Sequence, residues 1–455
     1  MSIKSAINLL SLEIGDCVTT SHAIRDQHSH NESHFDIALP DAVVFPRDTS
    51  EISTVLRVCT QEKCPVTAWG AGTALEGQHL PTAGGISLDL TTMNSILAVN
   101  QEDMDAVVQA GVTREQLNQD LRSQGLFFSV DPGANASIGG MASTRASGTT
   151  AMRYGTMRDN IKSLKVVLAD GRIVHTGSRA RKSASGLDLT SLMIGSEGTL
   201  GIISELVVKL HGTPEAISAA CCSFDTVENA VATVVKTIQM GVPVARMELV
   251  DTNYIQAINL RHDMELPLKP HLFMEFHGSE ASVQEQAATV ASIAQEFSGS
   301  EFEWKIKAED RNLLWKARHG AYEALASAYP GRLPFATDVC VPISHLAEMV
   351  SLAREDIDRS GLPAGIIGHV GDGNFHAQLM IRDGDVEDLR IAKNLSNDMA
   401  RRAIDIGGTV TGEHGIGMGK IELLQTEHGE AVSVMRGIKD YLDPQNILNP
   451  GKLYP

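Results

Sequence analysis

The chain has 455 residues, enough for two to four domains whose cores are stable without disulfides. Its 38 Lys and Arg residues against 56 Asp and Glu residues give a formal net charge of −18, which repels phosphate backbones and argues against nucleic-acid binding as the main task. Aromatic residues form only 4% of the chain, too few for base-stacking platforms, whereas 40 glycines indicate that glycine is used at defined positions.

The N-terminal region and the cysteines bear on the subcellular localisation of the protein. No stretch reaches 18 apolar residues and no cleavage site follows the N-terminus, so we expect neither a transmembrane segment nor secretion. Six cysteines without a C-x-x-C pair favour reduced thiols in a cytoplasmic protein, with a peripheral place at the inner membrane face as the alternative. The first forty residues are polar, and we expect an exposed entry arm rather than a metal-binding tract. They contain His22, His28, His30 and His34.

From residue 41 to about residue 213 the sequence alternates strand and helix signals. Asp48 fits the N-cap of one helix, and Thr113 with Gln116 forms the capping box of another helix that Gly125 ends. Asp170-Gly171 is a strong hairpin turn between two apolar runs. The expected strands are 42–45, 65–69, 106–110, 164–169, 172–176 and 202–210.

Three glycine-rich loops interrupt this region, at Gly70–Gly77, at 131–148 and at Gly195–Gly201. The first loop does not match the G-x-G-x-x-G dinucleotide fingerprint, and no G-x-x-x-x-G-K-[ST] sequence occurs. The sequence therefore argues against an NAD-binding Rossmann motif and against a P-loop. Each loop taken alone is either a plain turn or a cradle of backbone N–H groups for an anion. Three of them within about 130 residues favour one shared anionic ligand, and an adenine dinucleotide is long enough to reach all three.

Beyond Pro214 a strand–helix–strand rhythm predicts an antiparallel sheet with helices on one face. The last stretch, 443–452, is turn-rich, and we expect it to fold back without forming a core element. The expected strands are 217–224, 244–250, 271–277 and 336–341, and the expected helices are 227–240, 281–297, 310–328 and 346–359.

Two glycine-rich segments near the C-terminus carry the strongest chemical signal. His369 and His376 are separated by a turn with two glycines, which lets both imidazoles face one point, where a divalent metal would fit. If Glu413 completes that set, His414 is left beside the metal as a base with a near-neutral pKa. Hydrogen-bonded histidines in two glycine-rich turns are the alternative, because the spacing is not a dedicated signature.

A cation suited to an anionic substrate lies on the helix expected at 310–328. Arg318 and Arg311 are seven residues apart and share a face, and an arginine fork fits a bidentate grip on a carboxylate. A solvated helix face is the alternative for these side chains.

These residues resemble the FAD-linked D-2-hydroxyacid dehydrogenases, whose members oxidise D-lactate, D-2-hydroxyglutarate or glycolate. The resemblance covers the chain from about residue 38 to its end. It implies an α+β protein with a two-subdomain, vanillyl-alcohol-oxidase-type (PCMH-type) FAD domain and a cap domain containing an antiparallel sheet. The expected domains are 1–37, an N-terminal arm; 38–213, which binds FAD; 214–440, the cap; and 441–455, a tail returning to the FAD domain. The segments that carry the resemblance are Trp69–Thr73, Asp131–Ala134, Ile138–Gly140, Arg153–Gly155, Gly195–Gly201, His369–His376 and Gly412–Gly415.

Carried onto this sequence, the resemblance implies non-covalent FAD binding, because the Gly70 loop lacks the histidine that some relatives link to the flavin. The implied pyrophosphate-binding residues are Gly70, Ala71, Gly72, Thr73, Ala74, Leu75 and Gly77. The implied flavin and ribityl contacts are Pro132, Gly133, Gly139, Gly140, Ser143, Thr144, Ser147 and Gly148, with Gly198 and Ile203 at the adenine side and Asn449 returning from the tail. The resemblance also implies cofactor contacts from Trp69, Ala134, Ile138 and Tyr154.

In the cap, the resemblance implies His369, His376 and Glu413 as ligands of one divalent metal, Zn or Mn, with His414 as base and Arg318 as carboxylate anchor. Ala336 stands where the hydroxyglutarate branch has a lysine, which favours oxidation of D-lactate to pyruvate. Oxidation of D-2-hydroxyglutarate or glycolate, a flavin-free metal hydrolase and a non-catalytic flavin electron-transfer subunit are the alternatives. The expected partners are a small 2-hydroxy acid and an electron acceptor such as a quinone, a cytochrome or an electron-transfer flavoprotein, and the chain could form an oligomer.

Overall fold

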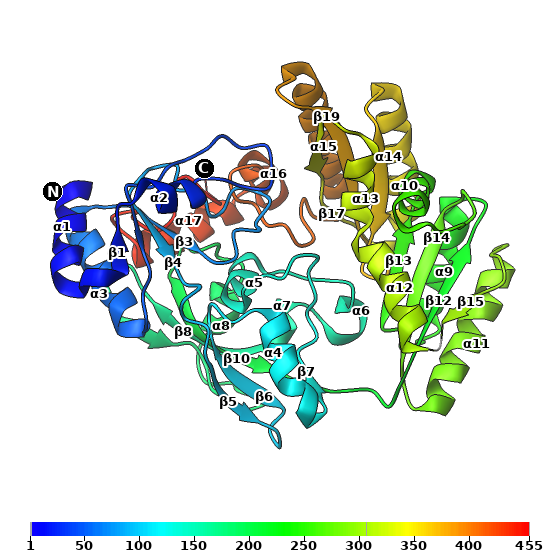
Figure 1. Cartoon of the computed structure of the whole chain (residues 1–455), viewed down its shortest axis with the longest axis horizontal. Helices are drawn as coiled ribbons and strands as arrows, with labels where there is room; N and C mark the ends of the chain where they lie inside the picture. Colours follow the sequence, from blue (N-terminus) through cyan, green and yellow to red (C-terminus); the bar gives the residue numbers. More distant parts are fainter. Residues whose placement is uncertain (1, 306, 455) are drawn as a thin grey trace. The chain divides into compact units, whose positions relative to one another are not determined.

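The computed structural model describes residues 2–305 and 307–454, which form two compact units (Figure 1). The first unit consists of residues 2–147, Gly155–Thr213 and 413–454, and the second of Gly148–Tyr154 and Pro214–Gly412. Both units combine helices with sheets, which confirms the α+β class. No helix in the described ranges is long and apolar enough to cross a bilayer. All six cysteines are thiols, as the sequence predicted.

The first unit begins with a four-stranded sheet in the order β1-β2-β4-β3. Strands β2, β4 and β3 are parallel, and β1 is antiparallel to β2. The Asp48 carboxylate accepts the N–H groups of Ser50 and Glu51, as expected for the N-cap of α3. The elements are α1 (Ile3–Ile14), β1 (Val18–Thr19), α2 (His22–Gln27), β2 (Ala42–Val44), α3 (Thr49–Glu62), β3 (Val66–Trp69) and β4 (Ile86–Asp89).

The expectation of an exposed N-terminal arm is wrong. Helix α1 packs on α3, and Ala6 and Leu10 are fully buried in the core of this unit. His28 is also buried, and each of its ring nitrogens faces an acceptor, Nε2 the Asp89 carboxylate at 2.8 Å and Nδ1 the Ile24 carbonyl at 2.8 Å. No three of the N-terminal histidines form a metal-ligand group in the part of the chain that the structure describes.

A second, antiparallel sheet in the order β5-β6-β10-β8-β9 completes the first unit's core. Helix α4 begins at the predicted Thr113 cap, and the chain reverses at Gly125 in a left-handed conformation. The elements are β5 (Ile96–Asn100), β6 (Asp105–Gln109), α4 (Arg114–Leu121), β7 (Leu126–Phe127), α7 (Met157–Asn160), β8 (Ile161–Val167), β9 (Ile173–His175), α8 (Leu189–Met193), β10 (Ile202–Lys209) and β11 (His211–Gly212).

The small-residue stretch 131–148 is not a continuous loop, because it contains helix α5 (Ile138–Thr144). Ser137 caps this helix by accepting the Gly140 N–H. Gly139 is required for its position, since a Cβ there would lie 2.5 Å from the Cβ of Ala110. Small residues therefore serve close packing of a short helix, which composition alone does not distinguish from loop flexibility.

The C-terminal tail does fold back, but it also contributes to the core. After α16 (Ile421–His428) and α17 (Ala431–Leu442), Leu448 forms a parallel bridge with Val66 at the edge strand β3. Ile447 and Leu448 are buried with the core residues of the first unit. The expectation that the tail forms no core element is therefore wrong, because two apolar residues between the turns extend the sheet.

The second unit has an antiparallel sheet in the order β15-β12-β14-β13-β18-β19-β16, with β17 paired to β19. The elements are α6 (Ala151–Tyr154), β12 (Ala216–Ser223), α9 (Val227–Gln239), β13 (Arg246–Val250), α10 (Thr252–His262), β14 (His271–Gly278), α11 (Glu280–Glu296), β15 (Glu303–Lys305), α12 (Ala308–His319), α13 (Ala321–Ala328), β16 (Arg332–Ala336), β17 (Val339–Cys340), α14 (Leu346–Ser360), β18 (Ala364–Gly368), β19 (Asn374–Arg382) and α15 (Val386–Asp405).

Helices cover both faces of this sheet, which corrects the expectation of one covered face (Figure 1). On one face α10, α12 and α13 pack against Ala219 and Cys221, while α11 packs against β12 and β14 with α9 and α14 beside it. Strand β12 reflects this arrangement, because its residues from Ser218 to Ser223 are all buried, whereas a strand with one solvent-facing side would alternate buried and exposed residues.

Candidate active site

His369 and His376 lie on either side of the tight turn that joins β18 to β19. Gly373 in this turn has φ +78°, and a Cβ there would lie 2.2 Å from the Val341 carbonyl oxygen, so only glycine fits. The two imidazole ring centroids are 5.5 Å apart. The predicted role of the glycine turn in bringing both rings to one point is thus confirmed.

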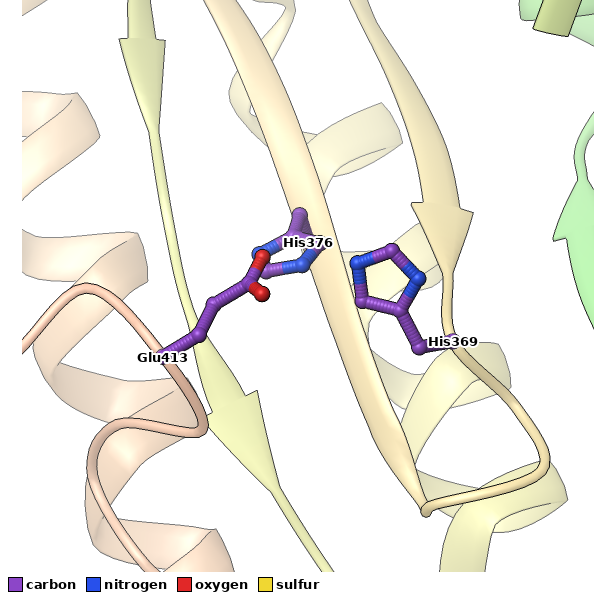
Figure 2. Close-up of side chains that lie close together, drawn as sticks. All are labelled: His369, His376 and Glu413. Atoms are coloured by element: carbon purple, nitrogen blue, oxygen red, sulfur yellow. The ribbon is translucent and has the colours of Figure 1, made fainter. Parts of the chain in front are cut away.

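Glu413 completes the cluster that the sequence predicted. Figure 2 shows both imidazoles and the Glu413 carboxylate directed at one another, and one ligand atom from each residue lies within 4.8 Å of the others. In the described part of the chain, these residues form the group of three His, Cys, Asp or Glu side chains that could hold a metal ion.

Hydrogen bonds on the far side of each imidazole fix its orientation. His369 Nδ1 lies 2.8 Å from Glu248 Oε1, and His376 Nδ1 lies 3.0 Å from the Thr337 carbonyl oxygen. Because a carbonyl or carboxylate oxygen only accepts, Nδ1 carries the proton in both rings and Nε2 presents its lone pair. This is the arrangement that metal-binding histidines require.

A second buried carboxylate holds the backbone next to Glu413. Asp338 is 1% exposed, and it accepts hydrogen bonds from Thr411 Oγ1 at 2.6 Å and from the Gly412 N–H at 2.8 Å. Asn374 Nδ2 also donates to Asp338 at 2.7 Å. Since Gly412 directly precedes Glu413, these bonds position the third candidate ligand.

Arg318 lies on α12 and is 8% exposed, which rules out the solvated helix face as its environment. Its guanidinium forms an ion pair with Glu248, whose side chain is completely buried. Glu248 therefore contacts both Arg318 and His369. Whether Arg318 grips a substrate carboxylate stays a prediction.

His414 is mostly buried, and its Nε2 lies 3.9 Å from Glu413 Oε1. Its backbone carbonyl accepts a hydrogen bond from Gln78 Nε2 at 2.7 Å. The predicted base is thus held next to the third candidate ligand, while its catalytic role stays a prediction.

The three predicted glycine-rich regions and the tail meet within the first unit. A Cβ at Gly70 would lie 2.4 Å from Ser137 Oγ, so the first loop touches the start of α5. Asn449 Nδ2 donates to the carbonyls of Gln78, directly after the first loop, and of Glu197 in the third loop, both at 2.8 Å. The three regions and the tail therefore lie close together, whereas their contact with one shared ligand stays a prediction.

The individual residues predicted to contact FAD occupy different environments. Gly72 and Gly77 both have φ +73°, a left-handed conformation that favours glycine. Ile203 is a buried core residue of β10, and the Tyr154 hydroxyl lies 2.7 Å from His277 Nδ1 in the second unit. Trp69 packs between the rings of His28 and His79. Residues Ile138, Gly139, Gly140, Ser143 and Thr144 lie on α5, and Ala71, Thr73, Ala74, Leu75, Pro132, Gly133, Ala134 and Ser147 lie in loops that are at least partly exposed.

Sequence reasoning missed the carboxylates behind the site. Glu248 is a charged residue within the otherwise apolar run Met247–Val250. A single acid in an apolar strand was the sequence signal that could have identified it as a functional residue. Glu197 is buried in the third loop and accepts the N–H groups of Ile416 and Gly417 at 2.7 and 2.8 Å. Burial raises the pKa of Glu197, and those two backbone donors oppose the shift.

Two family models match the two halves of the chain. The family model of the C-terminal domain of FAD linked oxidases matches residues 213–453, and the model of a FAD binding domain matches residues 40–177. A protein of Danio rerio named probable mitochondrial D-lactate dehydrogenase is 45% identical over 440 residues, covering 96% of this chain and 88% of that protein. The mitochondrial D-lactate dehydrogenase (cytochrome) of Arabidopsis thaliana is 44% identical and covers 99% of this chain and 80% of that protein.

Solved structures agree on the fold. A 4-ethylphenol oxidase from Gulosibacter chungangensis superposes with a TM-score of 0.79 at 19% identity, covering 99% of this chain and 97% of that chain. A p-cresol methylhydroxylase superposes with a TM-score of 0.79 at 18% identity, covering 99% and 96%. The chain therefore belongs to the FAD-linked oxidase family and has its two-part FAD-binding architecture.

Proposed function

We propose that this chain is a metal- and FAD-dependent dehydrogenase that oxidises D-lactate to pyruvate and passes the electrons to a cytochrome. The observation that carries the proposal is the convergence of His369, His376 and Glu413 in a member of the FAD-linked oxidase family. Relatives in Danio rerio, Arabidopsis thaliana and Kluyveromyces lactis, 38–45% identical to this chain, are named D-lactate dehydrogenases, which supports the substrate, and the names of two of them include cytochrome, which supports the acceptor.

The candidate ligands fit a divalent cation. Two imidazole nitrogens and a carboxylate oxygen serve Zn, Mn and Fe alike, at ligand distances of about 2.0–2.2 Å for zinc. The hydrogen bonds from both Nδ1 atoms direct the Nε2 atoms of His369 and His376 to the same side. The third donor, Glu413, follows a backbone segment that Asp338 holds in place.

Bound FAD would supply the hydride acceptor, and a cation at this site would supply the positive charge that favours an alkoxide. His414 removes the hydroxyl proton of the substrate, the task for which an imidazole is suited near neutral pH. Arg318 pairs with the substrate carboxylate. Its guanidinium has five N–H donors, so the ion pair with Glu248 leaves capacity for a second carboxylate.

The position of Ala336 supports a monocarboxylate substrate. Ala336 is the last residue of β16, opposite Gln378 of β19, and it offers no charge for a distal carboxylate. Glycolate is the second candidate substrate, because a glycolate oxidase subunit of Bacillus subtilis is 33% identical and covers 95% of this chain and 93% of that protein.

The substrate test is bleaching of the flavin absorbance in the purified full chain without an acceptor. D-lactate is expected to bleach the flavin faster than glycolate, D-2-hydroxyglutarate or L-lactate. Preference for the dicarboxylate would refute the argument from Ala336. A flavin that no hydroxy acid reduces would favour an electron-transfer subunit, and a colourless protein would favour a metal hydrolase.

The metal test is removal by a chelator followed by addition of Zn²⁺ or Mn²⁺. Flavin reduction by D-lactate is expected to fall on removal and to return with the metal. His376→Ala is the matched variant, because its reduction rate should not respond to added metal. Full activity of the metal-free wild-type protein would show that the histidine pair is structural.

A further inference from the structure

Glu248 is a buried acid that contacts two residues of the candidate active site. Its side chain has no exposed surface, and its carboxylate oxygens lie 2.8 and 3.0 Å from His369 Nδ1. The Arg318 guanidinium contacts the same carboxylate in an ion pair. One acid in the middle of β13 therefore joins a candidate metal ligand to the candidate substrate anchor.

The strand itself gives no structural reason for an acid at this position. Glu248 lies opposite Phe273 of β14, and Val250, two residues along on the same face, belongs to the apolar cluster with Tyr254. An apolar residue would satisfy the packing, whereas taking a carboxylate out of water costs several kcal/mol unless its partners compensate. Here the compensation comes from Arg318 and His369.

We propose that Glu248 is a positioning residue that fixes His369 with Nδ1 protonated and Nε2 directed at the metal, and that it orients Arg318 at the same time. The proposal rests on the proposed function and adds to it a coupling between metal binding and substrate binding. A variant without this carboxylate should bind both metal and substrate more weakly, although Glu248 is not one of the three candidate ligands.

Glu275 offers a matched control on the neighbouring strand. It is 6% exposed, its carboxylate lies 2.8 Å from His277 Nε2 and 3.2 Å from Arg246 Nε, and it belongs to the same sheet. It is therefore another buried acid between a histidine and an arginine, with a histidine outside the candidate metal-ligand group. Glu275→Gln therefore shows how far the loss of a buried acid from this sheet affects the protein when no candidate metal ligand loses a partner.

The experiment is a Mn²⁺ titration of the chelator-treated, FAD-loaded full chain, with free Mn²⁺ followed by electron paramagnetic resonance. Glu248→Gln is expected to raise the Mn²⁺ dissociation constant by about 10- to 100-fold, the usual effect of removing a partner of a metal-binding histidine. Glu275→Gln should stay within about twofold of wild type. At saturating Mn²⁺, Glu248→Gln should keep a raised KM for D-lactate, because Arg318 has lost its partner.

Each result decides a different question. Wild-type Mn²⁺ affinity in Glu248→Gln would overturn the positioning role, and so would an equal loss in Glu275→Gln. Absence of Mn²⁺ binding to the wild-type protein, with no change in His376→Ala, would instead overturn the proposed metal site. Glu248→Asp keeps the charge but shortens the side chain, so this variant should fold like wild type and lose part of the Mn²⁺ affinity. If Glu248→Gln does not fold, Glu248→Asp decides the question, and a wild-type Mn²⁺ affinity of Glu248→Asp would then overturn the proposal.

Discussion

Lys439 on α17 and Asp443, which directly follows this helix, form a buried ion pair that should hold the C-terminal tail against the FAD loops. The side chains of Lys439 and Asp443 are 3% and 0% exposed. The Lys439 ammonium donates to Asp443, to the Thr199 carbonyl at 2.9 Å and to the Leu448 carbonyl at 2.8 Å. Burial lowers the pKa of Lys439, and the Asp443 carboxylate opposes this shift.

Lys439→Met keeps most of the side-chain volume and removes the charge. It leaves the Asp443 carboxylate buried without its cation, and breaking a buried pair in this way costs about 3–5 kcal/mol. The N–H groups of Ile447 and Leu448 still donate to Asp443, at 3.1 and 2.8 Å, so the lower end of this range is expected. Asp443 binds the N–H of Leu448, and the next residue, Asn449, donates to the carbonyl of Glu197 in the third glycine-rich loop. Because the variant loosens this connection to a predicted FAD-binding loop, it should also release FAD more easily.

The same helix contains the control. Arg436 and Asp440 have the same i,i+4 spacing at 3.0 Å, but their side chains are 42% and 60% exposed. Arg436→Met should therefore cost about 0.5 kcal/mol or less. The assay is urea unfolding of the full chain, followed by the flavin fluorescence that appears on FAD release. A Lys439→Met variant no less stable than Arg436→Met would refute the reasoning that burial decides the value of this pair.

Three further outcomes are expected. His414→Ala should slow flavin reduction by D-lactate about 10²- to 10⁴-fold in stopped-flow measurements while leaving the flavin spectrum unchanged; a near-wild-type rate would remove the assignment as base. Burial lowers the pKa of His79 to about 4, below the value of about 6.5 expected in the unfolded chain, so its contribution to stability is complete above pH 6.5 and is lost towards pH 4. His79→Gln should remove up to about 1.4 kcal/mol per pH unit from the acid slope in urea unfolding, and an unchanged slope would contradict this. Gly139→Ala should cost about 1–3 kcal/mol because its Cβ would meet Ala110, whereas Gly133→Ala, with nothing within 4 Å, should cost much less; equal unfolding midpoints would show that α5 adjusts.

The sequence signals that succeeded were local. Thr113 and Gly125 both act within one turn of the chain. The Thr113 side chain accepts the Gln116 N–H as the predicted N-cap, and Gly125 ends the turn after α4. The Gln116 side chain donates to the Asn94 carbonyl instead of completing the capping box. The two histidines converge because a turn with Gly373 joins their strands, so a short spacing was sufficient to predict their meeting. Local chemistry of this kind does not depend on the rest of the fold.

The wrong expectation for the N-terminal region arose because it was based on amino-acid composition, whereas the spacing of the apolar residues indicates a helix. Histidines and polar residues suggested an exposed N-terminal arm, yet Ile3, Ile7, Leu10 and Ile14 follow helical spacings of four, three and four. His28 is buried because Asp89 accepts its ring N–H from a position 61 residues away, and no local pattern shows such a pairing.

Distance along the chain also explains why the acids behind the active site were missed. His369 is oriented by Glu248, 121 residues away, His376 by Thr337, 39 residues away, and Gly412, just before Glu413, by Asp338, 74 residues away. The candidate ligands themselves lie in short glycine-rich motifs, whereas each partner is fixed only by the register of the second unit's sheet and the turns at its edge. A candidate ligand set can therefore be predicted from sequence, whereas the distant residues that orient its side chains cannot. The comparison of Glu248→Gln with Glu275→Gln tests whether those distant partners, rather than the motif alone, set the metal affinity.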